Sequence, residues 1–273
     1  MLLEFAPPVL MGILNVTPDS FSDGGRLTSP AALVGRARGM VAAGARILDV
    51  GGESTRPGAE PVDAATELDR VLPAVAALHA AQLGAALSID TAKAEVAEAA
   101  LCKGASIVND VTALGDPRMA EVVARHAAAL VVMHLRGAPR TMQDGPIVYD
   151  DLLGEVLGAL EAAVGKAVAA GVVRERIMVD PGIGFGKTCA HNLELTRRLG
   201  ELGALGLPIV YGPSRKRFLG ELTGRAVDDR ERATAAACAA AVLNGAHVLR
   251  VHDVAAVRDA VLVAHGVRGV LEE

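Results

Sequence analysis

The amino-acid sequence predicts a (β/α)8 barrel made by a single domain that spans residues 1–273. Eight short apolar runs rich in Val and Ile recur along the chain, and a segment with helical patterning follows each of them. Such runs are typical of parallel strands buried on both faces, and their alternation with helices favours an α/β fold. Each run ends at a polar residue, and in this fold the C-terminal ends of the strands form the active site. These polar residues are Asn15, Asp49, Asp90, Asn109, His134, Asp180, Ser214 and Arg250.

The strands and helices follow one another in strict alternation. The strands are expected at residues 9–14, 46–50, 86–89, 106–108, 130–133, 176–179, 209–211 and 248–251. The helices are expected at residues 30–43, 62–83, 92–103, 117–126, 151–170, 192–202, 215–222, 230–243 and 254–264. Ser29 is placed to cap the first helix and Gly44 to stop it. A doubly wound open sheet is the alternative, but no G-x-G-x-x-G motif opens a helix after the first strand.

The composition narrows the class of protein. A length of 273 residues fits one barrel, which typically has about 250 residues, and a hydrophobic content of 51% supplies a large core. No apolar stretch reaches the roughly 18 residues that cross a bilayer, and residues 1–8 lack the basic cluster of a signal peptide. We therefore expect a cytoplasmic protein with no membrane partner. A net charge of −5 without a basic block argues against nucleic acid as a partner.

The cysteines and one alanine-rich segment give two further structural expectations. Cys102, Cys189 and Cys238 are odd in number and widely spaced, so we interpret them as buried free thiols in a reducing compartment. The helix at residues 230–243 consists almost entirely of small side chains, which permit the close approach of another element. That element is either the barrel wall or a second subunit.

The first two strand ends carry groups suited to charged ligands. Asn15 offers a hard oxygen ligand for Mg2+, and its alternative role is to cap an ordinary turn. Arg56, which follows the second strand, supplies a planar fork for a carboxylate or a phosphate. Asp49 and Glu53 flank the same segment, and they are either ligand-binding groups or internal ion-pair partners in the barrel.

Three further strand ends are suited to recognising a heterocycle. Asp90 and Asp180 offer carboxylates that accept a pair of N–H groups, whereas Asn109 offers an amide that both donates and accepts. A buried Asp without a partner is costly, so its presence implies a donor from a ligand or from the protein. The glycines at 182, 184 and 186 predict a flexible, open loop behind Asp180.

The last two strand ends combine cations with a hydroxyl and a histidine. Residues 214–217 read Ser-Arg-Lys-Arg and are expected in the first turn of a helix, where three cations oppose the helix macrodipole. An anionic or carbonyl-bearing ligand explains that arrangement, and a solvated basic surface is the alternative. Arg250 and His252 face the same side of a strand and suit a diphosphate. His134 is interpreted as a structural histidine.

Several long motifs in these segments resemble those of the dihydropteroate synthases of the folate pathway. The resemblance runs from about Met11 to Asp253, and the motifs occur in the family's order: GILNVTPDSFSDGG, LDVGGESTRPGA, SID, IVNDV, MH-R, DPGIGFGK, GPSRKRF and R-HD. It implies a transferase that joins 6-hydroxymethyl-7,8-dihydropterin diphosphate to 4-aminobenzoate and releases diphosphate. It further implies dependence on Mg2+, a homodimer and a target of sulfonamides.

The resemblance also implies a role for each site residue. The pterin would be bound by Asp90, Asn109, Met133, Asp180 and Lys216. The diphosphate would be held by Asn15, Arg250 and His252, with Asn15 as the metal ligand. The 4-aminobenzoate would be bound by Phe21, Thr55, Arg56, Pro57, Phe185 and Ser214. The catalytic groups would be Asp180, Lys216, Arg250 and His252.

Two related kinds of protein are the alternatives to a synthase. A methyltetrahydrofolate-dependent corrinoid methyltransferase would share the Asp and Asn residues that read the pterin, but not Ser-Arg-Lys together with Arg-x-His. A non-catalytic pterin-binding paralogue would be indicated by the loss of Arg250, His252 or the first loop. The sequence retains all of these, and the resemblance therefore favours the synthase.

Overall fold

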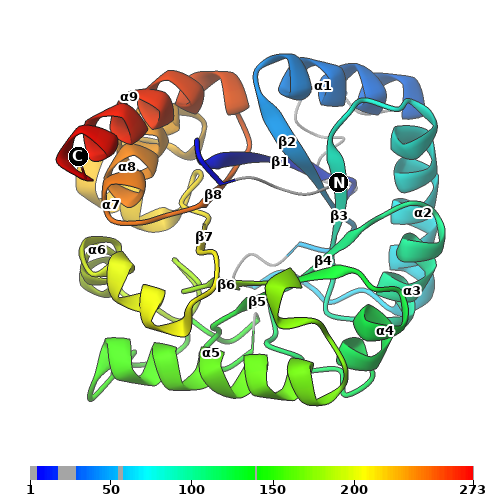
Figure 1. Cartoon of the computed structure of the whole chain (residues 1–273), viewed down its shortest axis with the longest axis horizontal. Coiled ribbons are helices and arrows are strands. Elements are labelled where there is room, and N and C mark those ends of the chain that lie inside the picture. Colours follow the sequence, from blue (N-terminus) through cyan, green and yellow to red (C-terminus); the bar gives the residue numbers. More distant parts are fainter. Residues whose placement is uncertain (1–4, 18–28, 55–57, 139, 273) are drawn as a thin grey trace.

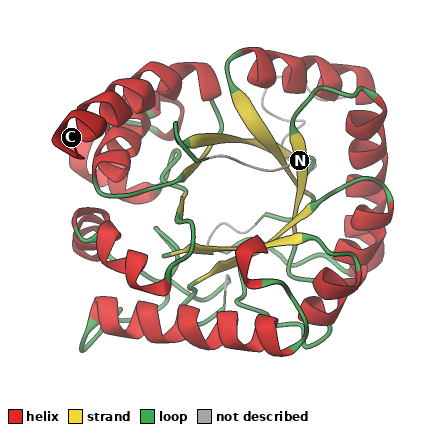
Figure 2. Ribbon diagram, viewed as in Figure 1, coloured by secondary structure: helices red, strands yellow, loops and turns green. Residues whose placement is uncertain are grey.

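The computed structural model describes residues 5–17, 29–54, 58–138 and 140–272, and these residues form the expected (β/α)8 barrel. The eight parallel strands lie in the order β6-β5-β4-β3-β2-β1-β8-β7. A bridge between Val179 and Ile209, with a hydrogen bond from the Val179 N–H to the Pro208 carbonyl (2.9 Å), brings β6 and β7 together. The helices surround the strands as an outer ring (Figure 1 and Figure 2).

The expected alternation of strands and helices is confirmed along the described chain. The strands are β1 (Val9–Asn15), β2 (Ala45–Gly51), β3 (Ala86–Asp90), β4 (Ile107–Asp110), β5 (Ala129–Met133), β6 (Ile177–Asp180), β7 (Val210–Tyr211) and β8 (Val248–Val251). The helices are α1 (Pro30–Ala42), α2 (Ala64–Ala80), α3 (Ala94–Cys102), α4 (Met119–Arg125), α5 (Leu152–Ala169), α6 (Cys189–Arg197), α7 (Arg217–Thr223), α8 (Glu231–Leu243) and α9 (Val254–Glu272).

Several helix boundaries differ from the prediction because capping side chains set them. The predicted N-cap of α1 is confirmed, since the Ser29 hydroxyl accepts a hydrogen bond from the Ala32 N–H (3.3 Å). α2 starts later than expected, where Asp63 accepts from the Thr66 N–H (2.7 Å). α6 starts earlier than expected, because Thr188 forms a capping box with the residue at N3. α6 is then followed by a 3₁₀ helix at Leu199–Leu205, whereas α9 continues well past the predicted end at residue 264.

The interior of the barrel is divided into an apolar floor and a polar mouth. Side chains two residues apart on a strand face the same side, so Ile47 and Asp49 of β2 both face inward. The floor is one buried cluster of Val9, Met11, Ile47, Ile107, Val131, Met178, Val210 and Val248. One step further along the strands, the register places Asp90 beside Asn109 and Met133 beside Asp180. Because side chains alternate between the two faces of each strand, the predicted polar residues lie together at one end of the barrel.

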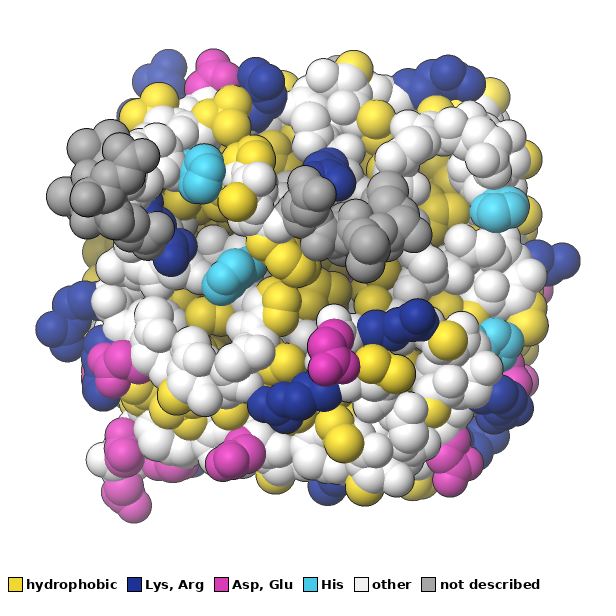
Figure 3. Space-filling view, viewed as in Figure 1, with side chains coloured by type: hydrophobic (Ala, Val, Ile, Leu, Met, Phe, Trp, Pro, Cys, Tyr) yellow, Lys and Arg dark blue, Asp and Glu magenta, His cyan; other side chains and the backbone are white. Residues whose placement is uncertain are grey.

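The outer faces of the strands pack against the helices in a larger hydrophobic cluster. In the space-filling view, hydrophobic side chains occupy the middle of the face shown, and most charged side chains surround them (Figure 3). The expectation of buried thiols holds for Cys238 only, because Cys189 is partly exposed and Cys102 is exposed near the end of α3. Among the described helices, none is long and apolar enough to cross a membrane.

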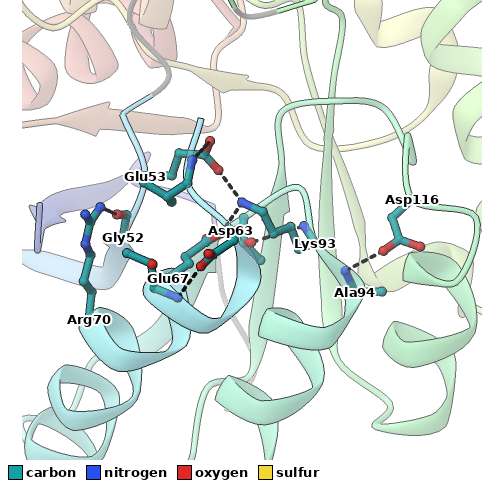
Figure 4. Close-up of polar contacts among 11 residues, drawn as sticks. Gly52, Glu53, Asp63, Glu67, Arg70, Lys93, Ala94 and Asp116 are labelled. Atoms are coloured by element: carbon teal, nitrogen blue, oxygen red, sulfur yellow. Dashed lines mark hydrogen bonds and ion pairs between the residues drawn. The ribbon is translucent and has the colours of Figure 1, made fainter. Parts of the chain in front are cut away.

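A partly buried ion-pair cluster ties down the chain where it leaves β2 (Figure 4). The Lys93 ammonium lies 2.5 Å from a Glu53 carboxylate oxygen and 2.6 Å from a Glu67 oxygen. The second Glu53 oxygen accepts from the Val62 N–H (3.2 Å), and Arg70 donates to the Gly52 carbonyl (2.8 Å). Glu53 thus joins the residues on either side of the segment 54–61. Of the two roles expected for Glu53, ligand binding or internal ion pairing, the structure shows the ion pair.

The Lys93 cation is expected to stabilise the fold, because Glu67 is fully buried and would otherwise lack a counter-charge. Removing one partner of a buried pair typically lowers the free energy of unfolding by 3–5 kcal/mol, and the partial exposure of Lys93 reduces this to about 2 kcal/mol. Lys93→Met should show this loss in urea denaturation at pH 7. The double variant with Glu67→Met should recover most of it, since no charge then stays buried. Equal stability of Lys93→Met and the wild type would contradict the assignment.

Candidate active site at the C-terminal ends of the strands

Arg250 of β8 lies at the centre of the barrel mouth and joins two other strands. Its Nε donates to Asp49 Oδ2 of β2 (2.7 Å), and its Nη2 donates to Asp90 Oδ2 of β3. Asn109 of β4 donates from its amide to the same Asp49 oxygen (3.1 Å). The predicted residues Asp90, Asn109 and Arg250 are therefore brought together. Of the two roles expected for Asp49, ligand binding or internal ion pairing, the structure shows the ion pair.

The charges of this cluster do not balance, because one guanidinium serves two buried carboxylates. Burial raises the pKa of Asp90 to about 7 against the attraction of Arg250, and the charge of Asp49 adds to the rise. Asp49 Oδ1, Asp90 Oδ1 and the hydroxyl of Ser88 are buried and have no hydrogen-bond partner among the residues that the structure describes. Buried polar atoms are nearly always paired in folded proteins, so these acceptors point to a ligand that supplies N–H or O–H donors.

A second pair of charges, Asp180 and Lys216, lies across the mouth. Asp180 accepts a hydrogen bond from the Gly182 N–H (2.7 Å), and burial raises its pKa although Lys216 attracts its charged form. Lys216 donates to the Ile183 carbonyl, and its Nζ lies 4.3 Å from the centroid of the Phe185 ring. Loss of hydration lowers the pKa of Lys216 to about 7, with Asp180 opposing the shift. Lys216 is therefore close to a change of charge at neutral pH.

Ser214 and His252 form a third polar unit beside Arg250. The Ser214 hydroxyl lies 2.9 Å from His252 Nδ1, and it accepts a hydrogen bond from the His252 N–H (3.2 Å). Ser214 is buried, whereas His252 is partly exposed at the mouth. The structure thus places a predicted 4-aminobenzoate residue next to a predicted diphosphate residue.

The prediction that three cations share the first turn of a helix is wrong. α7 begins only at Arg217, and Arg215 has a φ of 60°, which no helical residue adopts. Arg215 turns away to pair with Glu231 of α8 (2.6 Å), and the exposed Arg217 pairs with Glu221 on its own helix (2.7 Å). Lys216 alone of the three cations faces the site, so the basic cluster expected for an anion is dispersed.

The prediction of a flexible, open loop after β6 is also wrong. Gly182, Gly184 and Gly186 have φ values of 69°, 80° and 60°, a region that favours glycine. A side chain at Gly182 would collide with the His134 carbonyl, and one at Gly186 would collide with the backbone of Arg136. The glycines therefore serve close packing of the loop against the residues after β5.

The remaining predicted residues divide into those at the mouth and those outside the described ranges. Asn15 ends β1 beside Gly51 of β2. Met133 and Phe185 belong to one small apolar cluster together with Val111 and Met142. Phe21, Thr55, Arg56 and Pro57 lie outside the described residues.

Metal binding at the mouth would have to rely on few protein ligands. Within the described ranges, no group of three or more His, Cys, Asp or Glu is arranged to hold a metal ion. Mg2+ commonly takes one or two protein oxygens and completes its shell with water and substrate phosphates. The amide oxygen of Asn15 fits such a site, because it is a hard oxygen donor at the rim of the mouth.

Sequence reasoning missed one buried polar pair beside the site. Lys187 and His134 are both buried, and Lys187 Nζ lies 2.9 Å from His134 Nδ1. His134 was interpreted as structural, and no role was assigned to Lys187. The sequence could have indicated a role for Lys187, since this lysine directly follows the glycine-rich segment 182–186 at the end of a strand and must therefore lie near the mouth.

Comparison with known proteins identifies relatives of the whole barrel. A model of the pterin binding enzyme family matches residues 11–252. The dihydropteroate synthase of Synechocystis is 47% identical over 93% of this chain and 88% of its own length. The solved dihydropteroate synthase of Yersinia pestis with a sulfonamide drug superposes with a TM-score of 0.93 at 40% identity, over 98% of this chain and 96% of that one. The Xanthomonas albilineans enzyme with 4-aminobenzoic acid gives a TM-score of 0.90 at 44% identity, over 97% and 95% of the two chains.

These matches cover nearly all of the barrel and every described strand end, at identities far above those that indicate a shared fold alone. The cluster of Asp90, Asn109, Asp180, Lys216 and Arg250 lies inside the matched range. The chain therefore belongs to the pterin-binding enzymes and, within them, to the dihydropteroate synthase family of transferases of folate biosynthesis.

Proposed function

We propose that this enzyme condenses 6-hydroxymethyl-7,8-dihydropterin diphosphate with 4-aminobenzoate in the cytoplasm, and that it forms 7,8-dihydropteroate and diphosphate. The observation that carries the proposal is the meeting of two sets of groups in one mouth. Asp90, Asn109 and Asp180 supply acceptors for an N–H-rich ring, and Arg250 with the Ser214–His252 unit supplies donors for anions. The relatives from Xanthomonas albilineans and Yersinia pestis were solved with 4-aminobenzoic acid and with a sulfonamide drug.

The pterin ring would be read by groups that are already fixed on strands. The unpaired Oδ1 of Asp90 would accept N–H groups of the ring, as would Asp180, and Asn109 can both accept and donate. Met133, buried beside Phe185, would pack on the face of the ring. Lys216 would donate to the ring carbonyl and a ring nitrogen.

The diphosphate would leave toward Arg250 and His252. A guanidinium carries five N–H donors, and Arg250 directs two of them to Asp49 and Asp90, so others are available for phosphate oxygens. Donors fixed in place before the reaction stabilise the charge that develops as the C–O bond breaks. Bound Mg2+, with Asn15 as its protein ligand, would supply further stabilisation of negative charge on the leaving group.

The 4-aminobenzoate amine would attack the methylene carbon from the opposite side of the mouth. The electron-rich dihydropterin supports positive charge on that carbon, and Asp180 favours the same state electrostatically. Phe185 would frame the benzoate ring, and Ser214 would donate to the carboxylate. Phe21, Thr55, Arg56 and Pro57 complete this subsite as predictions from the sequence.

The central test of the proposal is a reaction with defined substrates. Purified enzyme mixed with the pterin diphosphate, 4-aminobenzoate and Mg2+ should release diphosphate and form dihydropteroate in equal amounts. A coupled assay for diphosphate and chromatography of the pteroate measure the two products. Omission of 4-aminobenzoate is the control and should abolish both. If neither product forms with the full mixture, the proposed reaction is wrong.

Removal of the metal should slow the reaction without unfolding the enzyme. Diphosphate is a poor leaving group when its charge is not neutralised, and a positioned catalytic charge contributes about 10²–10³-fold to a rate. We therefore expect treatment with EDTA to lower kcat by at least about 100-fold, and added Mg2+ to restore it. Circular dichroism before and after treatment provides the control for folding. Full activity in EDTA would exclude the metal from the reaction.

We propose that the enzyme is a homodimer and that α8 lies in its interface. The groove between α6, α7 and α8 has an apolar lining that includes Leu193, Phe218, Leu222, Ala233, Ala236, Ala237 and Ala240. Leu222 is 53% exposed and Leu193 is 42% exposed, which is unusual for two large apolar side chains in one groove. The small side chains of α8 would allow a second copy to approach closely.

The mass in solution tests this interface. Light scattering at micromolar concentration should give twice the chain mass of 27.9 kDa. Leu222→Asp should shift the mass to that of the monomer, because it places a charge in the apolar groove. Val263→Asp, at an exposed valine of α9 outside this groove, is the matched control and should leave the dimer intact. A monomer mass for the wild type would contradict the proposal.

A further inference from the structure

A buried lysine and a buried histidine lie behind the barrel mouth, and the proposed reaction leaves them without a role. Lys187 is only 3% exposed, and its ammonium contacts His134 Nδ1 (2.9 Å) and the Phe185 carbonyl (3.0 Å). Within the described ranges, no carboxylate forms a salt bridge with it. Burial of an ammonium without a direct counter-charge is costly, so this position calls for a specific purpose.

The protonation states of the pair follow from their contacts. Burial lowers the pKa of Lys187 to about 7, and the charge of Asp180 limits the drop. Burial and the neighbouring Lys187 charge lower the pKa of His134 to about 3, so this imidazole is neutral. A protonated Lys187 can only donate, so in that state His134 Nδ1 accepts and the ring proton is carried by Nε2. His134 therefore directs the ammonium toward the loop.

The loop that receives this hydrogen bond is held at every carbonyl from residue 182 to residue 186. The donors to Gly182, Ile183, Gly184, Phe185 and Gly186 are, in that order, the Phe185 N–H, Lys216, Gln143, Lys187 and Tyr149. Lys187 donates to the carbonyl of Phe185, whose ring contacts the Lys216 ammonium and packs with Met133.

The Phe185 ring is the part of the loop that would meet a substrate. It packs against Met133 and Met142, and the Lys216 ammonium lies 4.3 Å from its centroid. A hydrogen bond at the Phe185 carbonyl fixes the peptide plane that follows this residue, and it thereby limits the directions the ring can take. Loss of that bond would free the ring without touching any strand.

We propose that Lys187 and His134 are positioning residues that hold the Phe185 ring in place for the benzoate ring of 4-aminobenzoate. The inference rests on the proposed function. It concerns the 4-aminobenzoate side, because Lys187 bonds the carbonyl of Phe185, whereas Asp90 and Asn109 of the proposed pterin site are held on β3 and β4 by Arg250 and Asp49. Lys187 and His134 therefore act on 4-aminobenzoate through Phe185, and neither of the two residues needs to touch a substrate.

The first variant removes the ammonium and keeps the length of the side chain. Lys187→Met should raise the KM for 4-aminobenzoate about tenfold, since a lost hydrogen bond from a charged group typically changes an equilibrium by that factor or more. The KM for the pterin diphosphate and kcat at saturation should stay within about twofold. Lys166→Met, at an exposed lysine on α5, is the matched control and should leave all three constants unchanged.

The second pair of variants distinguishes positioning from simple filling of space. In His134→Asn the amide oxygen takes the place of Nδ1 and can still accept from Lys187, so the KM for 4-aminobenzoate should stay close to that of the wild type. In His134→Leu the acceptor is lost, and the KM should rise as in Lys187→Met. This pair keeps the inference testable if Lys187→Met does not fold, which thermal unfolding will show.

Two outcomes would overturn the inference. One is an unchanged KM for 4-aminobenzoate in Lys187→Met and His134→Leu, and the other is an equal loss in kcat and both KM values. If the wild type forms no dihydropteroate, the proposed function is wrong instead. Calorimetric titration of 4-aminobenzoate, with dihydropterin and diphosphate present, then still compares the variants directly. Equal dissociation constants in wild type and Lys187→Met would reject the positioning role.

Discussion

The ion-pair cluster around Arg250 is the interaction on which the barrel mouth depends. Its guanidinium extends from β8, which pairs with β1, and joins Asp49 of β2 and Asp90 of β3. Without this cation, two carboxylates would lie buried within one small space, and their repulsion would add to the loss of hydration. Arg250 therefore allows acidic groups to stand at two neighbouring strand ends, those of β2 and β3, where Asp90 could select a ring that offers N–H donors.

The same cluster explains why the site is both stable and incomplete. Hydrogen bonds to Asp49 and Asp90 hold the Arg250 guanidinium from two strands, so it has few ways to move when a ligand arrives. Yet one cation cannot satisfy two carboxylates, and buried acceptors are left over on Asp49 and Asp90. A ligand with donors relieves this imbalance, and an anionic leaving group finds a guanidinium already oriented. Preorganisation of this kind lowers the reorganisation that a reaction requires.

The sequence predicts the parts of this structure that arise from local patterning. Strand positions follow from the short apolar runs, and the inward direction of Asp90, Asn109 and Asp180 follows from the alternation of side chains along a strand. The contacts that join distant segments do not follow from it. Arg215 pairs with Glu231 of α8 rather than with a ligand, and Glu53 reaches Lys93 in the next βα unit. Nor does local pattern show that a glycine-rich loop is rigid, because the Gln143 and Tyr149 donors that hold it come from the segment after β5.

The two halves of the mouth are consequently fixed by different means. The side proposed to bind the pterin is built largely on strands, where the sheet itself sets the spacing of Asp90 and Asn109. The side proposed to bind 4-aminobenzoate includes the loop after β6, which has no ladder of hydrogen bonds and must obtain its order from side chains. In the loop after β6 that order comes from three glycines that permit close packing and from donors outside the loop that hold the carbonyls of Ile183, Gly184 and Gly186. A buried lysine that carries a charge at some energetic cost is reasonable in this setting, because its hydrogen bond to the Phe185 carbonyl does for the loop what the sheet does for the strands.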